Sequence, residues 1–166
     1  MSIYSVSSFY QPASNMLDND INTIWNANWT TGDPMPHNIV YDLGETMTLT
    51  DVSMLNRQTN NNAYLKNVNV YTSTNGSNWS SASTIEFEST SDWQSRPINT
   101  PEGKYVKFEI TSNQDGTNLA SIAEIRFGTC ANQPSVTVDF SANKTEFLGC
   151  EPIVFTANTS GEITSY

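Results

Sequence analysis

The strongest constraint on the fold is a set of short segments in which apolar and polar residues alternate. The longer segments span residues 39–43, 68–72 and 106–110, and shorter ones span 85–87 and 125–127. Side chains of a β-strand point alternately to opposite faces, so this alternation indicates strands with one buried face. Polar, turn-forming stretches separate them, at residues 32–34, 60–62, 75–77 and 113–116. Many short strands with such punctuation predict an all-β antiparallel sandwich or barrel.

The organisation of the chain changes near residues 128–134, a small and polar stretch. Alternation starts again between Val136 and Phe140, but only 33 residues follow Gln133. So short a segment cannot build an independent core without a staple or a metal. We therefore expect a β-module over residues 1–128, a linker over 129–133, and the beginning of a second β-domain over 134–166.

The charge of the chain excludes several classes of partner. It has 7 Lys and Arg against 17 Asp and Glu, a net charge of -10, and no run of basic residues. Phosphate backbones and anionic lipid headgroups are bound by basic patches, so we expect neither nucleic acid nor an acidic membrane as a partner. A neutral sugar or a divalent cation is compatible with this charge.

The sequence does not decide whether the two cysteines are bonded or where the protein is located. Cys130 and Cys150 either form one disulfide in an exported chain or remain inert thiols. The single histidine, His37, cannot complete a zinc cluster with them, and we expect it to order the start of a strand. Neither a signal peptide nor a transmembrane stretch is visible. The chain is therefore either cytosolic or a piece of an exported protein.

A series of landmarks occurs in order along the first part of the chain. They are an acidic loop at 13–25 ending in Thr-Ile-Trp, a strand at 36–44 ending in Asp-Leu-Gly, a hairpin at 70–79 with Asn-Gly-Ser-Asn-Trp, and a closing strand at 121–125. With these landmarks, residues 1–128 resemble the discoidin family, also called the coagulation factor five/eight type C domain. Its sugar-binding bacterial members form carbohydrate-binding module family 32. The resemblance implies an eight-stranded, galactose-binding-like jelly-roll β-sandwich.

The tail carries a second resemblance, through residues 138–142 and 153–158. These segments are similar to the first strands of a polycystic-kidney-disease-type domain, an immunoglobulin-like sandwich. The two modules together occur in multidomain surface proteins and glycoside-degrading enzymes of bacteria. The resemblance thus implies a monomeric module within a longer chain that is secreted or displayed at the cell surface.

The acidic loop contains a candidate cation site. Asp18 and Asp20 lie two residues apart and Thr23 follows, while Glu124 interrupts an otherwise apolar strand. Calcium takes about six to eight oxygen ligands from carboxylates, hydroxyls and carbonyls. A carboxylate on an apolar strand is costly unless it is paired or metal-bound. The spacing alone also allows a simple Asx-type turn with solvated carboxylates and an exposed Glu124.

The resemblance implies a structural calcium ion at this loop. Its ligands are expected to be the carbonyls of Asn15, Asp20, Thr23 and Ala123, the side chains of Asp18 and Glu124, and the Thr23 hydroxyl.

Two further loops contain a candidate sugar site. Such sites combine an aromatic ring, which packs on the C–H face of the sugar, with planar polar side chains that bind hydroxyls. The resemblance implies that Arg57 and Asn62 hold the hydroxyls of a glycan, with a galacto-configured sugar as one candidate. The remaining candidate contacts are Asn28, Trp29 and Tyr64. As alternatives, Arg57 pairs only with Glu45 or Asp51, and Tyr64 packs on the sandwich.

The chain departs from the family pattern at this site. The loop with Trp29 lacks the histidine usual in galactose binders, and Leu119 stands where they place an aromatic residue. Trp25 and Trp79 are expected in the core. No acid, base or nucleophile constellation is visible, so we expect a non-catalytic glycan-binding module. The alternative is a cell-adhesion or protein-interaction module that uses the same loops.

Overall fold

The computed structural model describes residues 1–131 of the chain. The predicted second domain, residues 134–166, and Cys150 lie outside the described residues, and so does any disulfide. Within residues 1–131 the chain contains β-strands and one short 3-10 helix. In this part of the chain, no helix is long and apolar enough to cross a membrane.

The elements follow one another along the chain as sequence alternation predicts, with mostly short strands between polar loops. Their bounds are β1 Ser2–Val6, η1 Ala13–Leu17, β2 Trp25–Asn26, β3 His37–Leu55, β4 Leu65–Ser73, β5 Ser83–Glu86, β6 Gln94–Pro97, β7 Gly103–Asn113, β8 Ser121–Ile122 and β9 Glu124–Ala131. Strand β9 therefore continues for three residues into the segment expected to be a linker.

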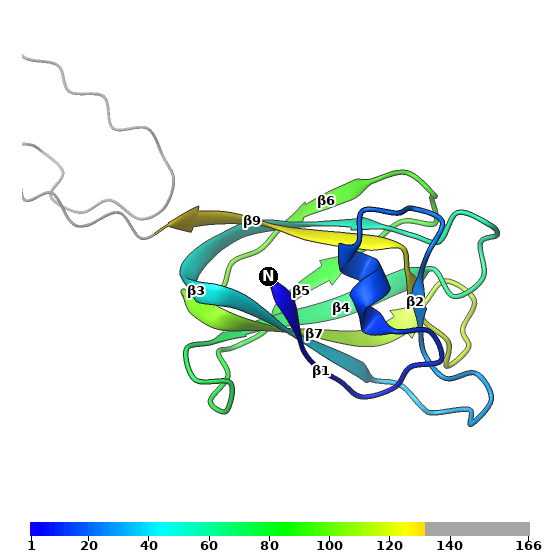
Figure 1. The fold of residues 1–166 in the computed structure, drawn as a ribbon, viewed down its shortest axis with the longest axis horizontal. Helices are drawn as coiled ribbons and strands as arrows, with labels where there is room; N and C mark the ends of the chain where they lie inside the picture. The colour runs from blue at the N-terminus through cyan, green and yellow to red at the C-terminus, as the bar shows by residue number, and fades with distance from the viewer. Residues whose placement is uncertain (132–166) are drawn as a thin grey trace, which may run out of the picture. The chain divides into compact units, whose positions relative to one another are not determined.

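The 19-residue strand β3 belongs to both layers of the sandwich. Residues 37–42 pair with β7, and β1 lies on their other side. Residues 47–55 pair with β9, and part of this stretch also pairs with β6. Between the two halves, Gly44 has a φ of 93°, which other residues rarely adopt, and its N–H donates to the Asp42 carboxylate. The strand bends here, and Figure 1 shows it passing from one layer to the other.

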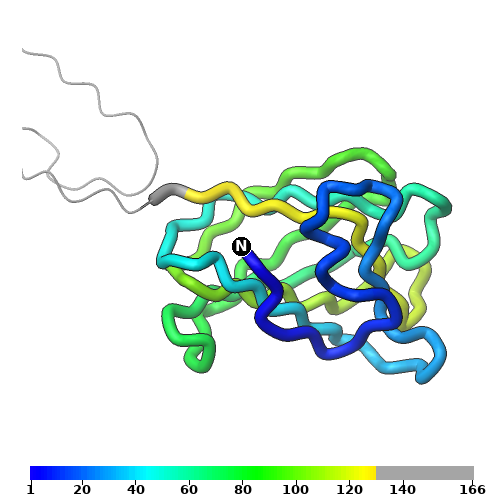
Figure 2. The backbone as a smooth tube through the Cα atoms, in the orientation of Figure 1, coloured from blue at the N-terminus to red at the C-terminus, as the bar shows by residue number. Residues whose placement is uncertain are grey.

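The two layers enclose one core. One layer has the strand order β1-β3-β7-β4-β5, and the other contains β6, the second half of β3, and β9. The short strands β2 and β8 pair with each other outside both layers. Figure 2 follows the backbone through this arrangement, with the loops that connect the strands gathered at the ends of the sandwich.

The side chains of the core confirm the predicted alternation. Phe108 and Ile110 of β7 are 0 % exposed, and so is Trp25, as expected. Trp79 is not a core residue, so that prediction is wrong. Its ring is half-buried on the outer face of the sheet, where the Lys107 ammonium lies 5.3 Å from the ring centroid. A cation–π contact with an outward-facing lysine takes the place of burial.

Four loops meet at one end of the sandwich, which we call the loop end. They span residues 27–34, 56–64, 88–93 and 114–120, and they lie at the right-hand side of Figure 1. Hydrogen bonds join them, for example from the N–H of Ala27 to the carbonyl of Ala120 at 2.9 Å. The buried His37 ring also donates to the carbonyl of Asn118 at 2.6 Å, which fixes the start of β3 as expected.

Candidate functional site

The acidic loop after η1 brings several oxygen atoms together. The Thr23 hydroxyl lies 2.8 Å from Oδ2 of Asp18, 3.1 Å from the carbonyl of Asp20 and 3.5 Å from the carbonyl of Asn15. The loop reverses at Asn19, which has a positive φ of 61°. The side chain of Asp20 points elsewhere and accepts from Asn22. The oxygens that converge are thus those of Asn15, Asp18, Asp20 and Thr23.

Glu124 lies next to this loop. Its side chain is 2 % exposed, and its Oε1 atom accepts no hydrogen bond from the described residues. Burial raises the pKa of Glu124, and the neighbouring Asp18 carboxylate raises it further. By contrast, the N–H of Asp20 and the Thr23 hydroxyl lower the pKa of Asp18. Two carboxylates therefore face each other, and one oxygen of the buried one, Oε1 of Glu124, has no hydrogen-bond partner among the described residues.

These residues fit a hard divalent cation. A buried, unpartnered carboxylate oxygen is costly, and a cation between Glu124 and Asp18 would offset that cost. Within residues 1–131, no group of three or more His, Cys, Asp or Glu side chains gathers. Most ligands would therefore be carbonyls and a hydroxyl, beside two carboxylates, and calcium binds such all-oxygen sets. Ala123, the remaining expected ligand, precedes Glu124, and its N–H donates to the carbonyl of Leu55 at 2.9 Å.

Arg57 begins one of the loops at the loop end. Its Nη2 atom donates to the Thr59 hydroxyl at 3.2 Å, and its buried Nε atom has no hydrogen-bond partner in the described part of the chain. Tyr64 is only 5 % exposed, and its hydroxyl donates to the carbonyl of Arg57 at 3.0 Å. Tyr64 therefore packs on the sandwich and supports the loop, so its ring offers no free face to a ligand.

Neither of the suggested carboxylate partners holds Arg57. The ion pairs among residues 1–131 join Arg96 to Glu88 and Lys104 to Asp42. The Asp51 carboxylate instead accepts hydrogen bonds from neighbouring hydroxyls of β3 and β6. Arg57 thus keeps several N–H donors for a ligand.

Asn62 is exposed on the same loop, with its amide side chain free of hydrogen bonds to described residues. Its backbone is held on both sides. Its N–H donates to the Asn60 side chain at 3.1 Å, and its carbonyl accepts from the Ser121 hydroxyl at 3.4 Å. The next N–H, of Ala63, donates to the Asp115 carboxylate at 2.6 Å. A fixed backbone with a free amide can both donate to and accept from a ligand.

Trp29 is 54 % exposed on the neighbouring loop. Asn28 shapes that loop, because its Oδ1 atom accepts from the N–H and the hydroxyl of Thr30 at 3.0 and 2.6 Å. Buried Ser8 holds both ends of the loop. Its hydroxyl accepts from the N–H of Asn28 at 2.9 Å and donates to the Asp33 carboxylate at 2.6 Å.

An aromatic residue that the sequence analysis did not select lies beside Trp29. The ring centroid of Tyr10 is 5.2 Å from that of Trp29, and Tyr10 is itself 54 % exposed. The only sequence signal for it is the Phe9-Tyr10 pair in an otherwise polar stretch.

The structure connects the loops of Trp29 and Asn62 through one residue. Asn26, at the base of the Trp29 loop, pairs with Ser121, and the Ser121 hydroxyl donates to the carbonyl of Asn62. The N–H of Ser121 also donates to the carbonyl of Ala63 at 3.0 Å. An aromatic platform, an amide and a guanidinium thus occupy the loop end together.

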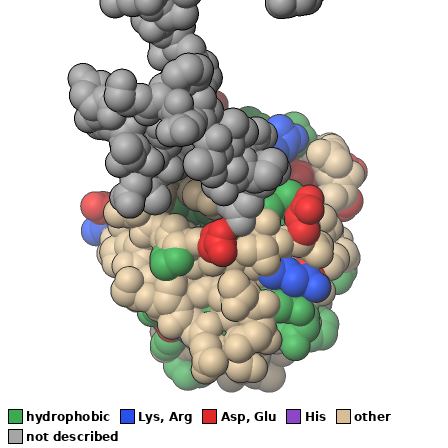
Figure 3. Space-filling view, turned by 90° about the vertical axis from the view of Figure 1, so that its left-hand side faces the viewer, with side chains coloured by type: hydrophobic (Ala, Val, Ile, Leu, Met, Phe, Trp, Pro, Cys, Tyr) green, Lys and Arg blue, Asp and Glu red, His purple; other side chains and the backbone are tan. Residues whose placement is uncertain are grey.

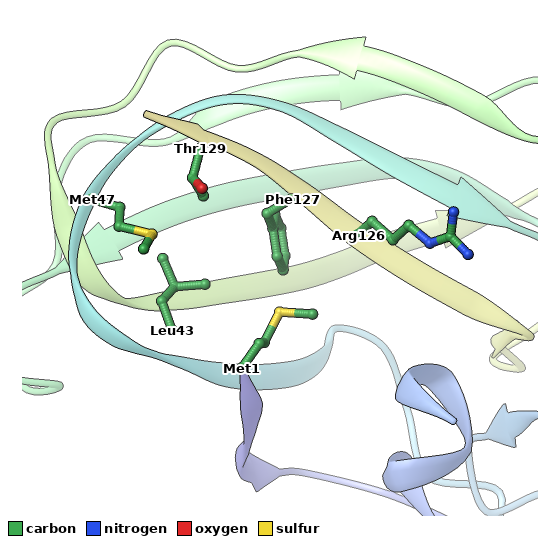
Figure 4. A pocket seen from close by; sticks show the side chains of 6 residues that line it. All are labelled: Met1, Leu43, Met47, Arg126, Phe127 and Thr129. Carbon is green, nitrogen blue, oxygen red and sulfur yellow. The ribbon is translucent and has the colours of Figure 1, made fainter. Parts of the chain in front are cut away.

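A separate hollow of about 270 Å³ lies near the bend of β3, away from the loop end. Figure 4 shows its lining, Met1, Leu43, Met47, Arg126, Phe127 and Thr129. Few polar side chains converge there, so it lacks the chemistry of a polar-ligand site. The visible part of that side of the molecule carries basic side chains singly, with acidic ones among them (Figure 3).

Comparisons with known proteins agree with this geometry. The F5/8 type C domain model matches residues 2–125. A sialidase of Micromonospora viridifaciens is 29 % identical over 116 residues, which are 68 % of this chain and 18 % of the sialidase. A galactose oxidase of Gibberella zeae is 33 % identical over 121 residues, 66 % of this chain and 17 % of the oxidase. The chain thus spans less than a fifth of these relatives.

Solved structures share the fold. A family 32 carbohydrate-binding module from NanJ of C. perfringens, in complex with galactose, has a TM-score of 0.66 and 23 % identity, and the match covers 74 % of this chain and 90 % of that one. A related module from a family 31 glycoside hydrolase of Clostridium perfringens has a TM-score of 0.70 and 23 % identity, with coverages of 78 % and 90 %. The predicted discoidin-like, all-β sandwich is confirmed. The chain belongs to the F5/8 type C domain family.

Proposed function

We propose that residues 1–131 form a non-catalytic carbohydrate-binding module of a larger, exported bacterial protein, and that the loop end binds the glycan. One observation carries this proposal. An exposed tryptophan, Trp29, shares the loop end with a guanidinium and an amide, of Arg57 and Asn62, that have unused hydrogen-bonding groups. Such a combination binds sugars, which have an apolar C–H face and a ring of hydroxyls.

The chemistry of the site divides between these side chains. Arg57 offers planar donors in a fixed fork, and Asn62 both donates and accepts, so together they can read the orientation of neighbouring hydroxyls. Trp29, backed by Tyr10, supplies the apolar contact. The site is shallow and open to water, so a single sugar should bind with a Kd of roughly 0.1 to 1 mM, or about −4 to −5.5 kcal/mol.

A galacto-configured glycan is the first candidate. One similar module was solved in complex with galactose and another in complex with GalNAc-β-1,3-galactose. One relative of the chain is a sialidase. These similarities support a role in attaching a larger glycan-processing protein to its substrate, with repeated modules raising the avidity.

Calcium is the proposed structural cofactor. Asp18, Glu124 and the Thr23 hydroxyl would hold it, together with the carbonyls of Asn15, Asp20, Thr23 and Ala123. When bound, the ion supplies positive charge that neutralises two facing carboxylates. The chain's own residues then tie the acidic loop to β9, at the side of the sandwich next to the loop end.

A protein partner is the second candidate for the same loops. Phe9, Tyr10 and Trp29 are all more than half exposed, at 56 %, 54 % and 54 %, and such aromatic groups also anchor protein interfaces. A glycan array separates the two functions. The intact chain should bind galacto-configured glycans, and Trp29→Ala should lose that binding with its melting temperature unchanged. An array without any bound glycan would contradict the carbohydrate proposal and favour the protein partner.

A further inference from the structure

A second aromatic and basic pair lies on the outer face of the sheet near the loop end. Trp93, directly before β6, is 41 % exposed. The guanidinium carbon of Arg126, on β9, lies 4.4 Å from its ring centroid. The two strands flank the second half of β3, where Ser53 pairs with Arg126 on one side and with Ser95 on the other. Arg126 also lines the hollow near the bend of β3, but Figure 4 shows its guanidinium end pointing away from Phe127.

The charge of this pair is not neutralised by a carboxylate contact. Among residues 1–131 there are three arginines, and Arg96 pairs with Glu88 at 3.3 Å. Arg57 and Arg126 have no Asp or Glu oxygen within 4.0 Å in the described part of the chain. In a chain with a net charge of -10, one of the two arginines without a carboxylate contact lies against Trp93, and the other, Arg57, belongs to a loop that is hydrogen-bonded to the loop of Trp93.

The acidic groups around Arg126 have other contacts. Asp92, next to Trp93, accepts from the Thr90 hydroxyl at 3.3 Å. The positive charge of Arg126 acts to lower the pKa of Glu124, but the Glu124 carboxylate faces Asp18. The N–H groups of Arg126 make no hydrogen bond to a described residue, and its side chain is exposed. A guanidinium that lies 4.4 Å from an indole ring centroid, with N–H groups not used by described residues, is suited to bind a carboxylate through two hydrogen bonds.

Trp93 belongs to a loop that is fixed to the loop of Arg57. The Asn56 amide donates to the carbonyl of Thr90 at 2.8 Å, and the Gln58 amide donates to the carbonyl of Ser91 at 2.9 Å. Gln94 pairs with Met54. From strand spacing and rise, the backbones of Trp93 and Arg57 are separated by a distance on the order of 10 Å. One glycan chain can therefore reach both.

We propose that Trp93 and Arg126 form a subsite for an acidic sugar unit, in a glycan chain whose neighbouring unit is held by Arg57 and Asn62. This proposal rests on the proposed carbohydrate-binding function. Arg126 binds the carboxylate of the acidic sugar, and the uncovered part of the Trp93 ring packs on its C–H face. The module thus prefers an acidic oligosaccharide over the neutral one of the same length.

The test compares matched neutral and acidic ligands by calorimetric titration of the intact chain. The probes are lactose against 3′-sialyllactose, and galactotriose against trigalacturonate. In at least one pair the acidic member should bind about fivefold tighter, because an exposed charge-assisted contact is modest. Arg126→Gln should abolish this preference and leave the affinity for the neutral member unchanged. Arg126→Lys, which keeps the charge but not the planar fork, should retain only part of the preference.

The control variant is Arg96→Gln, which removes the same charge at a guanidinium already paired with Glu88. It should keep the acidic preference, since its position is not in the subsite. Equal affinity for neutral and acidic members, with binding still lost in Arg57→Ala, would overturn the subsite and leave the carbohydrate function intact. Absence of binding to every probe would overturn both. An unchanged preference in Arg126→Gln would also refute the subsite.

Discussion

Removing the charge of Glu124 should have opposite effects on stability with and without calcium. The Glu124 side chain is 2 % exposed, and one of its oxygens has no partner. Glutamine keeps the shape of the side chain and removes both its charge and its repulsion with Asp18. In the absence of calcium, Glu124→Gln should therefore unfold at a higher temperature than the wild type.

The magnitude follows from the burial of the group. An unsatisfied buried polar group costs roughly 1 to 3 kcal/mol, so the variant should gain on the order of 1 kcal/mol in chelator. Calcium at 100 times its Kd should stabilise the wild type by about 2.7 kcal/mol, because only the folded state binds it. For a domain of this size, that energy raises Tm by roughly 10 °C. Without the Glu124 carboxylate, most of this increase should be lost.

Differential scanning calorimetry with excess EGTA and with millimolar calcium measures both effects. The wild type should melt higher than Glu124→Gln in calcium, and lower than it in EGTA. The control is Glu86→Gln, an exposed residue of β5, which should keep the calcium-dependent increase. If calcium leaves the melting temperature of the wild type unchanged, the reasoning about the acidic loop is wrong.

Four further changes test other parts of the structure. Ser8→Ala should weaken glycan binding and cost about 1 kcal/mol of stability, because the Ser8 hydroxyl holds both ends of the Trp29 loop; titration and thermal melting measure the two effects. The Ser8 and Thr31 hydroxyls lower the pKa of Asp33 below its ordinary value of 3.8, so its stabilising contribution is present above that pH and lost as pH falls through the lowered pKa. Amide NMR signals of residues 28–33 should shift in that acid range in the wild type and not in Asp33→Asn. Phe108→Ala, at a position 0 % exposed, should cost about 3 to 5 kcal/mol in urea unfolding. A chain ending at Pro134 should melt as a folded unit, as the compact unit Met1–Pro134 predicts, and loss of its transition in calorimetry would contradict this.

The sequence predicts the faces of the strands better than their extent. A period of two assigns Phe108 and Ile110 to the core without further information, because pleating alone sets the direction of alternate side chains. It does not show that residues 37–55 form one bent strand shared by two layers. The bend depends on the backbone of Gly44 and on pairing with strands far away in the sequence, and neither leaves an alternation signal.

In the candidate sites too, the sequence predicts some features, whereas others depend on how distant segments pack together. Glu124 could be selected because a carboxylate on an apolar strand is costly, but its position beside Asp18 comes from the fold. The exposure of Trp29 and the support from Tyr10 depend on how the loops pack, as does the burial of Tyr64. Polarity and aromatic character alone cannot distinguish an exposed aromatic ring that can bind a ligand from a buried aromatic ring that supports a loop. For the same reason Trp79 was expected inside and lies on the surface.

The most direct test of the central claim is a calorimetric titration of the intact chain with lactose, for the wild type and Arg57→Ala. Arg57 lies in a loop and has no carboxylate partner among residues 1–131, so its removal should change the melting temperature little. The wild type should bind with a Kd of roughly 0.1 to 1 mM. Arg57→Ala should show no measurable heat of binding, whereas Arg96→Ala should bind as the wild type does. Equal binding by the wild type and Arg57→Ala would contradict the proposed site.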